Sequence, residues 1–469
     1  MLRELDKTNK LEWSLFPTVF ALAWPTMLEQ FMGTAVQYID TAMVGALGTA
    51  ATASVGSTTT VNWLIGSSVS AFGVGFLSYI SQMCGAGDFE KAKKASAQSM
   101  LAVIAAGSFF TIITLSLSRI VPVWMRVSPE IREMASAYFF VLYTPMLFRT
   151  ATVIFGTVLR AAGDTKTPMR VGLGVNLINV ALNYLLIYKT RRIRILGASI
   201  PMWGAGLGVV GAAAASAAAT VFGGIAITTA LLKNEKISPL GQSLKPDGAV
   251  LRPCLRVAVP NMLQRFGTSL GYVAFAAMIN SLGQTATAAH TIANTVESAF
   301  YVPGYGMMTA AATLTGNAIG AGDKERLYKQ ARLIFFLEVS MMVISGGMLF
   351  AFAPKMVGLF STDPSVIRLG STVLRMVACS EPFYGVSIVI EGMLLGAGKT
   401  VAPFIFGVSG MWGVRITGTF LCTQVLGFGL ISAWGCMILH NLILFFMFVI
   451  FCRHGKWIPL SGNEKPAVH

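Results

Sequence analysis

Charged residues are scarce in this sequence. Asp, Glu, Lys and Arg make up only 12% of the 469 residues, whereas 54% are hydrophobic and the mean hydropathy is +0.67. Soluble domains carry about 25% charged residues, so the composition excludes a water-soluble multidomain protein. Apolar runs of about 20 residues, far longer than the roughly 10 of a barrel strand, predict a membrane protein whose spanning elements are helices.

Cysteine is also sparse, and the short motifs of enzymes and channels are missing. The six cysteines show no CxxC spacing, which favours buried free thiols over a zinc site or a disulfide framework. The sequence contains no HExxH, GxSxG or P-loop motif and nothing that resembles a selectivity filter. His290 and His440 have no Cys or Asp at ligand spacing. We therefore expect neither an enzyme nor a channel, and no cofactor.

Twelve apolar segments predict an all-α polytopic membrane protein with both termini on one side. The predicted spans are 14–40, 53–82, 95–118, 133–157, 168–188, 205–232, 254–280, 288–318, 330–353, 368–395, 401–426 and 431–452. With the termini cytoplasmic, inside segments carry 22 Lys and Arg residues and outside segments carry 10, as the positive-inside rule requires. One predicted outside loop is an exception, since it contains Lys189, Arg191, Arg192 and Arg194. We expect a multi-pass protein of the cell membrane, in contact with the lipid bilayer.

The formal charge of +15 does not indicate a nucleic-acid partner. The basic residues lie in the short segments between apolar runs, and no basic face carries interleaved aromatic residues. Membrane topology accounts for these charges.

The sequence contains an internal repeat at an offset of 235 residues. Pro25 aligns with Pro260, and Gly-Ala-Gly-Asp at 85–88 aligns with the same four residues at 320–323. The register holds over the first five spans of each half, and the sixth is displaced by 14 extra residues after Tyr188. We therefore predict an N-terminal six-helix lobe at 1–232, a cytoplasmic linker at 233–253, a C-terminal six-helix lobe at 254–452 and a cytoplasmic tail at 453–469.

The even number of spans in each repeat predicts two parallel bundles. Both copies enter the membrane in the same direction, so a pseudo-two-fold axis runs along the membrane normal. The bundles then face each other across a central cleft, an arrangement suited to alternating access.

Several motifs on this framework resemble the multidrug and toxic compound extrusion (MATE) family of cation-coupled antiporters, in its bacterial form. They are YIDTAMVG at 38–45 followed by Leu47-Gly48, GAGD at 85–88, LRAAGDT at 159–165 with Pro168, the Asn179 and Asn183 pair, and AAHTIA at 288–293. The resemblance covers about residues 14 to 452. Major-facilitator transporters share the six-plus-six plan, but the loop at 83–94 lacks the arginines of their signature.

Asp40 is the leading candidate for a cation-coupling residue, because charge at membrane depth is costly. Asn176, Asn179 and Asn183 stand at i, i+3 and i+7 of the fifth span, on one helix face. Carboxylate and amide oxygens suit Na⁺, or a proton held by a partly desolvated carboxyl. The resemblance implies that this cluster, with Ser216 of the sixth span, couples cation movement to transport. The alternative is that these groups form hydrogen bonds between helices.

Three arginines also lie within predicted spans. Arg265 occupies the repeat position of Gln30 and would pair with Glu29 if the first and seventh spans line the cleft. Alternatively, unpaired arginines make the cleft electropositive, and their planar guanidinium groups fit a carboxylate or phosphate. The candidate substrate-binding residues are Glu29, Gln30, Arg149, Arg265, Arg415 and Tyr384.

Two further expectations concern the second half. Where better-known bacterial members of the MATE family carry acids in the seventh and tenth spans, this chain has Thr268 and Tyr384, which argues against a cation site there. Glu338 in the ninth span could reach the lipid headgroups.

The leading hypothesis is a MATE-type antiporter that exports amphiphilic organic compounds in exchange for Na⁺ or H⁺, and that acts as a monomer. We expect no bound metal other than Na⁺ at Asp40, Asn179 and Asn183, if Na⁺ is the coupling ion. The alternative is a transporter of an organic anion or a lipid-linked headgroup recognised by the cleft arginines. Substrate charge and the choice between Na⁺ and H⁺ stay open.

Overall fold

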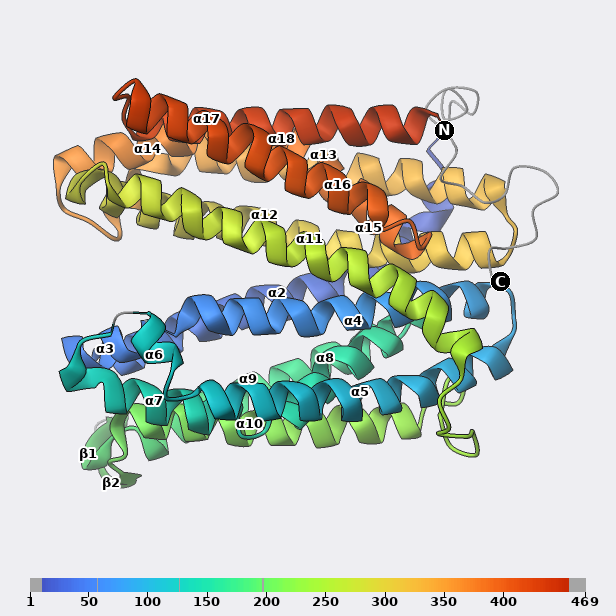
Figure 1. Ribbon diagram of the computed structural model, residues 1–469, viewed down its shortest axis with the longest axis horizontal. Coiled ribbons are helices and arrows are strands. Elements are labelled where there is room, and N and C mark those ends of the chain that lie inside the picture. Colours follow the sequence, from blue (N-terminus) through green and yellow to red (C-terminus); the bar gives the residue numbers. More distant parts are fainter. Residues whose placement is uncertain (1–10, 57, 126, 196–197, 455–469) are drawn as a thin grey trace.

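The computed structural model describes residues 11–56, 58–125, 127–195 and 198–454, and nearly all of them are helical (Figure 1). The first half contains η1 (Trp13–Leu15), α2 (Phe16–Gly45), α3 (Thr49–Gly56), α4 (Thr59–Gly85), α5 (Phe89–Leu117), α6 (Val121–Trp124), α7 (Pro129–Tyr143), α8 (Met146–Ala161), α9 (Lys166–Leu186), β1 (Lys189–Ile195), β2 (Ala198–Ala205) and α10 (Gly208–Leu232).

The second half contains α11 (Gly248–Asn280), α12 (Gln284–Gly320), α13 (Lys324–Gly358), α14 (Pro364–Ala378), α15 (Glu381–Gly396), α16 (Val401–Ser409), η2 (Gly410–Ile416), α17 (Thr417–Phe420), η3 (Leu421–Val425) and α18 (Leu430–Arg453). Most of the predicted tail at 453–469 lies outside the described residues.

All twelve predicted spans are helical, which confirms the twelve-helix fold. The fourth span is the bent pair α7 and α8, at 50°, and the tenth is the bent pair α14 and α15, at 55°. Pro145 lies at the first bend, where it supplies no amide proton to continue the helix. Pro382 follows the second bend directly.

Hydropathy alone identifies only some of these spans. Seven helical segments of the described chain are long and apolar enough to cross a membrane, and the two bent pairs raise the number to nine. The other three are α2, α11 and α12, which are 30, 33 and 37 residues long. Helix α12 packs against α2, and both α11 and α12 pack against α4, where the lobes meet. They carry more polar residues because neighbouring helices shield them from lipid.

The lobes lie side by side, and the long helices run between the two ends of the molecule (Figure 1). We call the end where η1 begins and α18 ends the terminus end, and the opposite end, next to β1 and β2, the hairpin end. Residues 233–247 join α10 to α11 at the terminus end.

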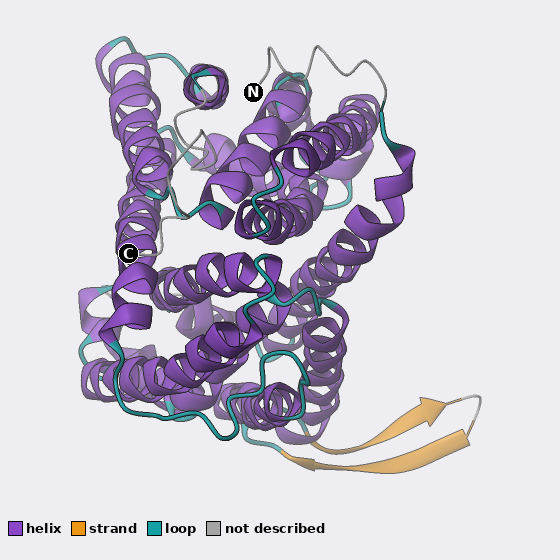
Figure 2. Ribbon diagram, turned by 90° about the vertical axis from the view of Figure 1, so that its right-hand side faces the viewer, coloured by secondary structure: helices purple, strands orange, loops and turns teal. Residues whose placement is uncertain are grey.

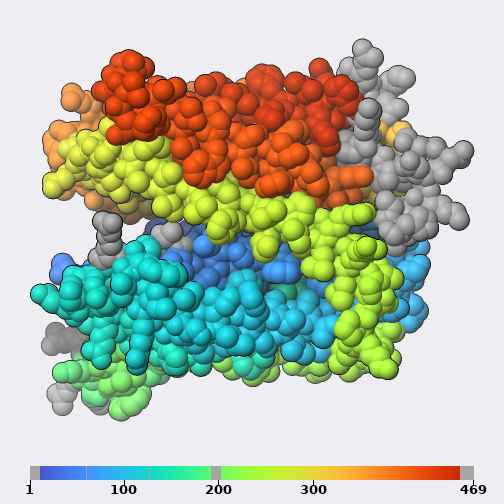
Figure 3. Space-filling model, in the orientation of Figure 1, coloured from blue at the N-terminus to red at the C-terminus, as the bar shows by residue number. Residues whose placement is uncertain are grey.

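In each lobe, the first part of one helix packs into the core of the other lobe. Val19 and Leu22 of α2 belong to a core cluster formed mainly by α12, α13, α15 and α18. The repeat-related Cys254 of α11 packs with Phe76 and Ile80 of α4. Figure 3 shows α11 crossing the boundary between the lobes on the way to its own bundle. This reciprocal exchange ties the lobes together at the terminus end.

The last turns of α4 and α12 cross at main-chain distance at the same end. A Cβ atom on Gly85 would overlap the main chain of Asn317, and one on Gly320 would overlap the main chain of Gln82. The two contacts are related by the 235-residue repeat, so the pseudo-two-fold axis passes between them. Only glycine permits this approach at both positions.

Hydrogen bonds reinforce the closed end. Ser78 Oγ and Gln82 Nε2 donate to the carbonyl oxygen of Gly396 at 3.1 and 2.9 Å. Thr313 Oγ1 donates to the carbonyl oxygen of Arg160 at 3.3 Å. Every one of these bonds joins one lobe to the other.

Contacts between the lobes near the hairpin end involve longer side chains. The hydroxyl of Tyr38 donates to the carbonyl oxygen of Thr295 at 3.5 Å, and the rings of Trp63 and Tyr272 lie edge to face at 6.3 Å. Tyr38, Trp63 and Tyr272 are all exposed, at 44%, 54% and 42%. The lobes are therefore tightly joined at the terminus end and loosely joined at the hairpin end.

The basic loop after Tyr188 forms a secondary structure that helix patterns did not predict. Residues 189–195 and 198–205 pair as antiparallel strands, and the hairpin projects from the helices (Figure 2). The guanidinium of Arg191 lies 4.0 Å from the centre of the Tyr188 ring. This cation–π contact holds one of the basic side chains against the end of α9.

We expect Gly320→Ala to shift the protein away from the state closed at the terminus end. The new methyl group must push α4 and α12 apart, and overpacking of this kind costs about 1–3 kcal/mol. Distances between spin labels at Glu90→Cys and Glu325→Cys, in a background without the six native cysteines, should lengthen. Gly347→Ala is the matched control, because its Cβ would meet no atom within 4 Å. Unchanged distances in Gly320→Ala would contradict the role of the crossing.

Candidate functional site

A polar cluster lies inside the first lobe, between α2, α9 and α10. Asn183 Nδ2 donates to Asp40 Oδ1 at 2.6 Å. Asn179 finds complementary partners for both amide atoms when Nδ2 donates to Asp40 Oδ1 at 2.8 Å and Oδ1 accepts from Ser216 Oγ at 2.9 Å. The carboxylate therefore accepts two amide hydrogen bonds, and the second amide is held by the serine.

Close packing of α9 and α10 permits the contact between Asn179 and Ser216. A Cβ atom on Gly211 would overlap the main chain of Leu186, so the two helices touch at that level. Asn179 and Asn183 are buried, with 6% and 1% of their surfaces exposed. Their sequence spacing of four places both on the face of α9 that meets α10 and α2.

One atom of the cluster lacks a partner. Asn183 Oδ1 is buried and accepts no hydrogen bond. A buried acceptor without a donor costs about 1–3 kcal/mol, which a bound cation or an added proton donor would recover.

The structure brings together four of the five predicted cation-coupling residues. Asp40, Asn179, Asn183 and Ser216 form the connected cluster. Asn176 lies one turn earlier on α9 and is joined to the cluster by no hydrogen bond among those described. A shared helix face was therefore insufficient to place Asn176 in the cluster, although α2 still lies against α9 one turn further on, where a Cβ atom on Gly172 would meet the side chain of Glu29.

A central cavity of about 630 Å³ lies between the lobes. Residues from α2, α4 and α8 line one side, and residues from α11, α12 and α15 line the other. Uncharged polar groups in the lining include Gln30, Asn62, Ser67, Ser70, Thr157 and Thr309. The cavity extends from Trp63, near the hairpin end, to Leu395, near the closed terminus end. None of the four clustered residues lines it.

Three arginines line this cavity, and no carboxylate does so among the described residues. Arg160 Nη2 forms an ion pair with Glu29 Oε2 at 2.6 Å. The predicted pairing of Glu29 with Arg265 is therefore wrong: the acid bonds to the arginine of its own lobe, at the end of α8. Arg149 and Arg265 have no carboxylate within 4 Å in the described part of the chain.

The remaining substrate-site candidates are divided between the cavity and the protein interior. Gln30, Arg149 and Arg265 line the cavity. Tyr384 lies behind it, where its hydroxyl is 3.3 Å from the hydroxyl of the lining residue Tyr305.

Arg415 does not belong to the cavity, contrary to its prediction as a cleft residue. It is 4% exposed inside the second lobe, and its guanidinium lies 4.3 Å from the ring centre of Phe275 and 4.8 Å from that of Tyr272. The π-helical geometry of η2 changes the direction in which this side chain points, which a regular helical periodicity cannot anticipate.

Sequence reasoning missed several lining residues. Arg160 belongs to the LRAAGDT motif but was counted with the cytoplasmic loop charges, although it lies in the last turn of α8. Trp63, Tyr301 and Tyr305 were not singled out, because aromatic residues in membrane helices usually face lipid or other helices. The repeat offers a signal for Arg160, since its counterpart is the apolar Leu395.

Three acids are buried in the second lobe. Glu297, Glu338 and Glu381 are 6%, 0% and 1% exposed. Glu338 occupies space left by Gly304 and Gly385, and neither of its oxygens has a hydrogen-bond partner. The prediction that Glu338 reaches lipid headgroups is therefore wrong. No group of three or more His, Cys, Asp and Glu side chains is arranged to hold a metal among the described residues.

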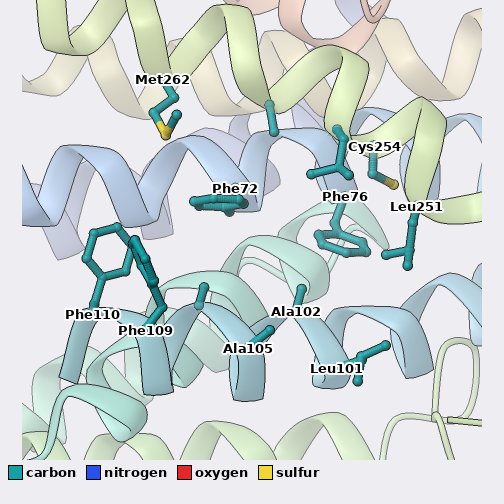
Figure 4. A pocket seen from close by; sticks show the side chains of 13 residues that line it. Phe72, Phe76, Leu101, Ala102, Ala105, Phe109, Phe110, Leu251, Cys254 and Met262 are labelled. Atoms are coloured by element: carbon teal, nitrogen blue, oxygen red, sulfur yellow. The ribbon is translucent and has the colours of Figure 1, made fainter. Parts of the chain in front are cut away.

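A separate apolar groove of about 440 Å³ lies on the outer side of α4. Side chains of Phe72 and Phe76 from α4, Phe109 from α5, and Cys254 and Met262 from α11 surround it (Figure 4). It spans the boundary between the lobes, and its lining contains no charged side chain and, apart from the thiol of Cys254, no polar one.

Comparison with known families identifies the framework. The family model MatE matches twice, at residues 25–185 and 260–421. The chain belongs to the MatE family. The two matches begin 235 residues apart, so they coincide with the internal repeat. The resemblance to MATE transporters stated from the sequence motifs is confirmed.

Members of the MatE family with similar sequences are named as transporters, not enzymes. This chain is 27% identical over 447 residues to the probable multidrug resistance protein NorM of Thermotoga maritima, covering 95% of this chain and 93% of the relative. It is 25% identical to the probable multidrug resistance protein YoeA of Bacillus subtilis, covering 87% of each chain. The chain is accordingly a multi-pass membrane protein.

Solved structures share the fold of this MatE protein. A MOP superfamily transporter from Pyrococcus furiosus, described as having a binding pocket of reverse polarity, aligns with a TM-score of 0.86 at 22% identity and covers 94% of this chain and 96% of its own. An outward-facing multidrug resistance MATE transporter aligns with a TM-score of 0.85 at 22% identity, covering 93% and 95%.

We expect Glu29→Gln to destabilise this MatE protein by about 1–3 kcal/mol, because Arg160 would keep its charge in a partly buried site without a carboxylate. The double variant Glu29→Gln with Arg160→Leu should regain much of the loss. It reproduces in the first lobe the residues Gln264 and Leu395, which occupy the same repeat positions in the second. Thermal unfolding midpoints of the purified proteins measure the effect. A double variant less stable than the single one would show that the pair does not act as argued.

Proposed function

We propose that the protein is an antiporter that exports amphiphilic organic compounds, including drugs, in exchange for a cation that enters the cell. The carrying observation is the Asp40 cluster, a connected and largely buried polar site inside one lobe and apart from the central cavity. A carboxylate at membrane depth is costly unless it serves a purpose. The names of the relatives, as multidrug resistance proteins, support export as the direction of transport.

The residues present fit Na⁺ or a proton. Asp40 supplies a carboxylate, and Asn179, Asn183 and Ser216 supply further oxygen atoms of the hard type that Na⁺ prefers. The unpartnered Asn183 Oδ1 is the acceptor that either ion would satisfy: Na⁺ directly, or a protonated carboxyl through its hydroxyl. No other cofactor is part of the proposal.

Helix α2 connects the cluster to the cavity and to the second lobe. From the terminus end to the hairpin end it carries Val19 in the core of the other lobe, Gln30 at the cavity and Asp40 in the cluster. Cation binding at Asp40 changes the hydrogen bonds between α2 and α9. This in turn changes how α2 packs against the second lobe. Alternating access follows if the two ion states of the cluster favour different lobe arrangements.

The proposal includes a location and an orientation. Predicted inside segments carry 22 Lys and Arg residues and outside segments carry 10. This distribution supports a protein of the cell membrane whose terminus end faces the cytoplasm, with both termini inside. The cavity, closed at the terminus end, then faces outward. The small organic substrate and the bilayer are the partners, nucleic acid is not, and the protein acts as a monomer.

We expect Asp40→Asn to abolish gradient-driven transport while leaving the protein folded. Asparagine keeps the size of the side chain and one oxygen that can accept the bonds now made to Asp40 Oδ1, but it carries no negative charge and takes up no proton. Uptake of a fluorescent amphiphile by proteoliposomes, driven by an imposed gradient, measures the effect. Asp363→Asn, at the exposed start of α14, is the control, because asparagine also caps a helix there. Full activity in Asp40→Asn would refute the coupling role.

The same vesicles distinguish the two ions. Imposed Na⁺ and H⁺ gradients are applied separately, with the other ion equal on both sides and the membrane potential clamped. Asn183→Leu should weaken Na⁺ coupling by about tenfold or more, because it removes an oxygen ligand. A protein driven by H⁺ alone should keep more of its activity in this variant. Dependence on neither gradient would exclude antiport.

A further inference from the structure

The charge of the central cavity indicates its substrate class. The cavity is lined by Arg149, Arg160 and Arg265, and by no carboxylate among the described residues. Glu29 neutralises Arg160 through a 2.6 Å ion pair. Two positive charges, at Arg149 and Arg265, are left without an ion pair in the part of the chain that is described.

No described carboxylate forms an ion pair with either arginine. Arg149 lies over the Tyr143 ring, with 5.3 Å between the guanidinium carbon and the ring centre. Glu391 lies near Arg265, but it accepts from Gln264 Nε2 at 3.1 Å and does not line the cavity. The buried Arg265 Nε makes no hydrogen bond. Each guanidinium has five N–H donors, and no ion pair among the described residues occupies those of Arg149 or Arg265.

The arginines lie on opposite walls. Arg149 is in the first turn of α8 in the first lobe, and Arg265 is midway along α11 in the second. Arg160 follows Arg149 by 11 residues on the same face of α8, about 16 Å deeper toward the closed end. A ligand in the part of the cavity farther from the closed terminus end thus meets one unpaired guanidinium from each lobe. The positive charge of Arg160, nearer that end, is already neutralised by Glu29.

The rest of the lining suits an organic body attached to the charge. Trp63, Tyr301 and Tyr305 offer aromatic surface, and the volume of about 630 Å³ matches a drug-sized molecule. We propose that the cavity binds amphiphilic organic anions, whose carboxylate, sulfonate or phosphate group bridges Arg149 and Arg265. This inference rests on the proposed transport function in taking the central cavity as the substrate site.

Physical chemistry favours an anion over a cation at this position. A cation would be placed beside two guanidinium groups with no carboxylate among the described lining residues and only the partly buried Glu391 near Arg265, in a partly desolvated site where repulsion is strong. A carboxylate or phosphate would gain charge-assisted hydrogen bonds with a fork geometry that matches its oxygens. The two lobes would also share the ligand, so binding would depend on their relative position.

A matched pair of dyes tests the proposal. 5-Carboxyfluorescein and rhodamine 123 share a xanthene skeleton but carry opposite charge, so their difference reports on charge. Fluorescence anisotropy with the purified full-length protein in detergent, at pH 8, gives both dissociation constants. We expect the anionic dye to bind more tightly. Tighter binding of rhodamine 123, or no binding of 5-carboxyfluorescein, would overturn the proposal.

Variants locate the binding group. Arg149→Gln and Arg265→Gln should each weaken binding of 5-carboxyfluorescein by about 10-fold or more, because each removes a charge-assisted contact. Neither should weaken binding of rhodamine 123. Glutamine is accepted at the position of Arg265 in the first repeat, as Gln30. Arg256→Gln is the matched control, on the same helix but exposed and outside the cavity. Equal dissociation constants in wild type and both cavity variants would refute the role of the arginines.

A further variant guards against loss of folding. Arg265→Lys keeps the charge but not the fork, so it should lose less affinity for 5-carboxyfluorescein than Arg265→Gln. If Arg265→Gln unfolds, the lysine variant with Arg149→Gln carries the test, and unchanged anion affinity in both would refute the proposal. Because binding in detergent needs no ion gradient, this failure is distinct from failure of coupling at Asp40.

Discussion

The close crossing of α4 and α12 is the constraint on which the arrangement of the molecule depends. Because Gly85 and Gly320 have no Cβ atom, the main chains of α4 and α12 can touch at both positions. The two contacts are equivalent positions of the 235-residue repeat. The crossing closes the terminus end, so that the space between the lobes is left toward the hairpin end. Helices α2 and α11 strengthen this closure by packing their first turns into the opposite lobe. The cavity, its floor near Leu395 and the position of Arg160 all follow from where the lobes touch.

The two lobes share this scaffold, but they differ in polar chemistry at equivalent positions. Asp40 corresponds to Phe275, Gln30 to Arg265 and Arg149 to Tyr384. The first lobe therefore contains the connected carboxylate cluster. The second contributes a cavity arginine and keeps Glu297, Glu338 and Glu381 buried, without an ion pair among the described residues. Small residues at the boundary were retained in both halves because packing requires them. Charged residues could diverge because each faces a different environment in its own lobe.

Much of the fold could be predicted from the sequence, and less of the site. Apolar length and the repeat predicted twelve helices in two lobes, since both signals extend over many residues. The cluster of Asp40, Asn179, Asn183 and Ser216 was also predicted as a group, with help from the family resemblance. The partner of Glu29 was not, because Gln30 and Arg265 are repeat-related whereas Arg160 lies 131 residues away within the same lobe. The direction of Arg415 depends on the π-helical turn of η2, and the strands of the hairpin depend on local pairing that helix periodicity does not report.

The separation of the cluster from the cavity has a consequence for the transport cycle. Two unpaired guanidinium groups cost little free energy while water in the cavity solvates them. Closing the lobes around them without a counter-charge would remove that water and raise the free energy of the closed state. An anionic substrate would neutralise them and make the occluded state less costly. The protein without substrate has no anion to neutralise the two arginines. A cation at Asp40 would then have to favour, through α2, the change of lobe arrangement that returns the empty protein to its starting state. Substrate and cation would then act on the same equilibrium from different sites, which is what obligatory exchange requires.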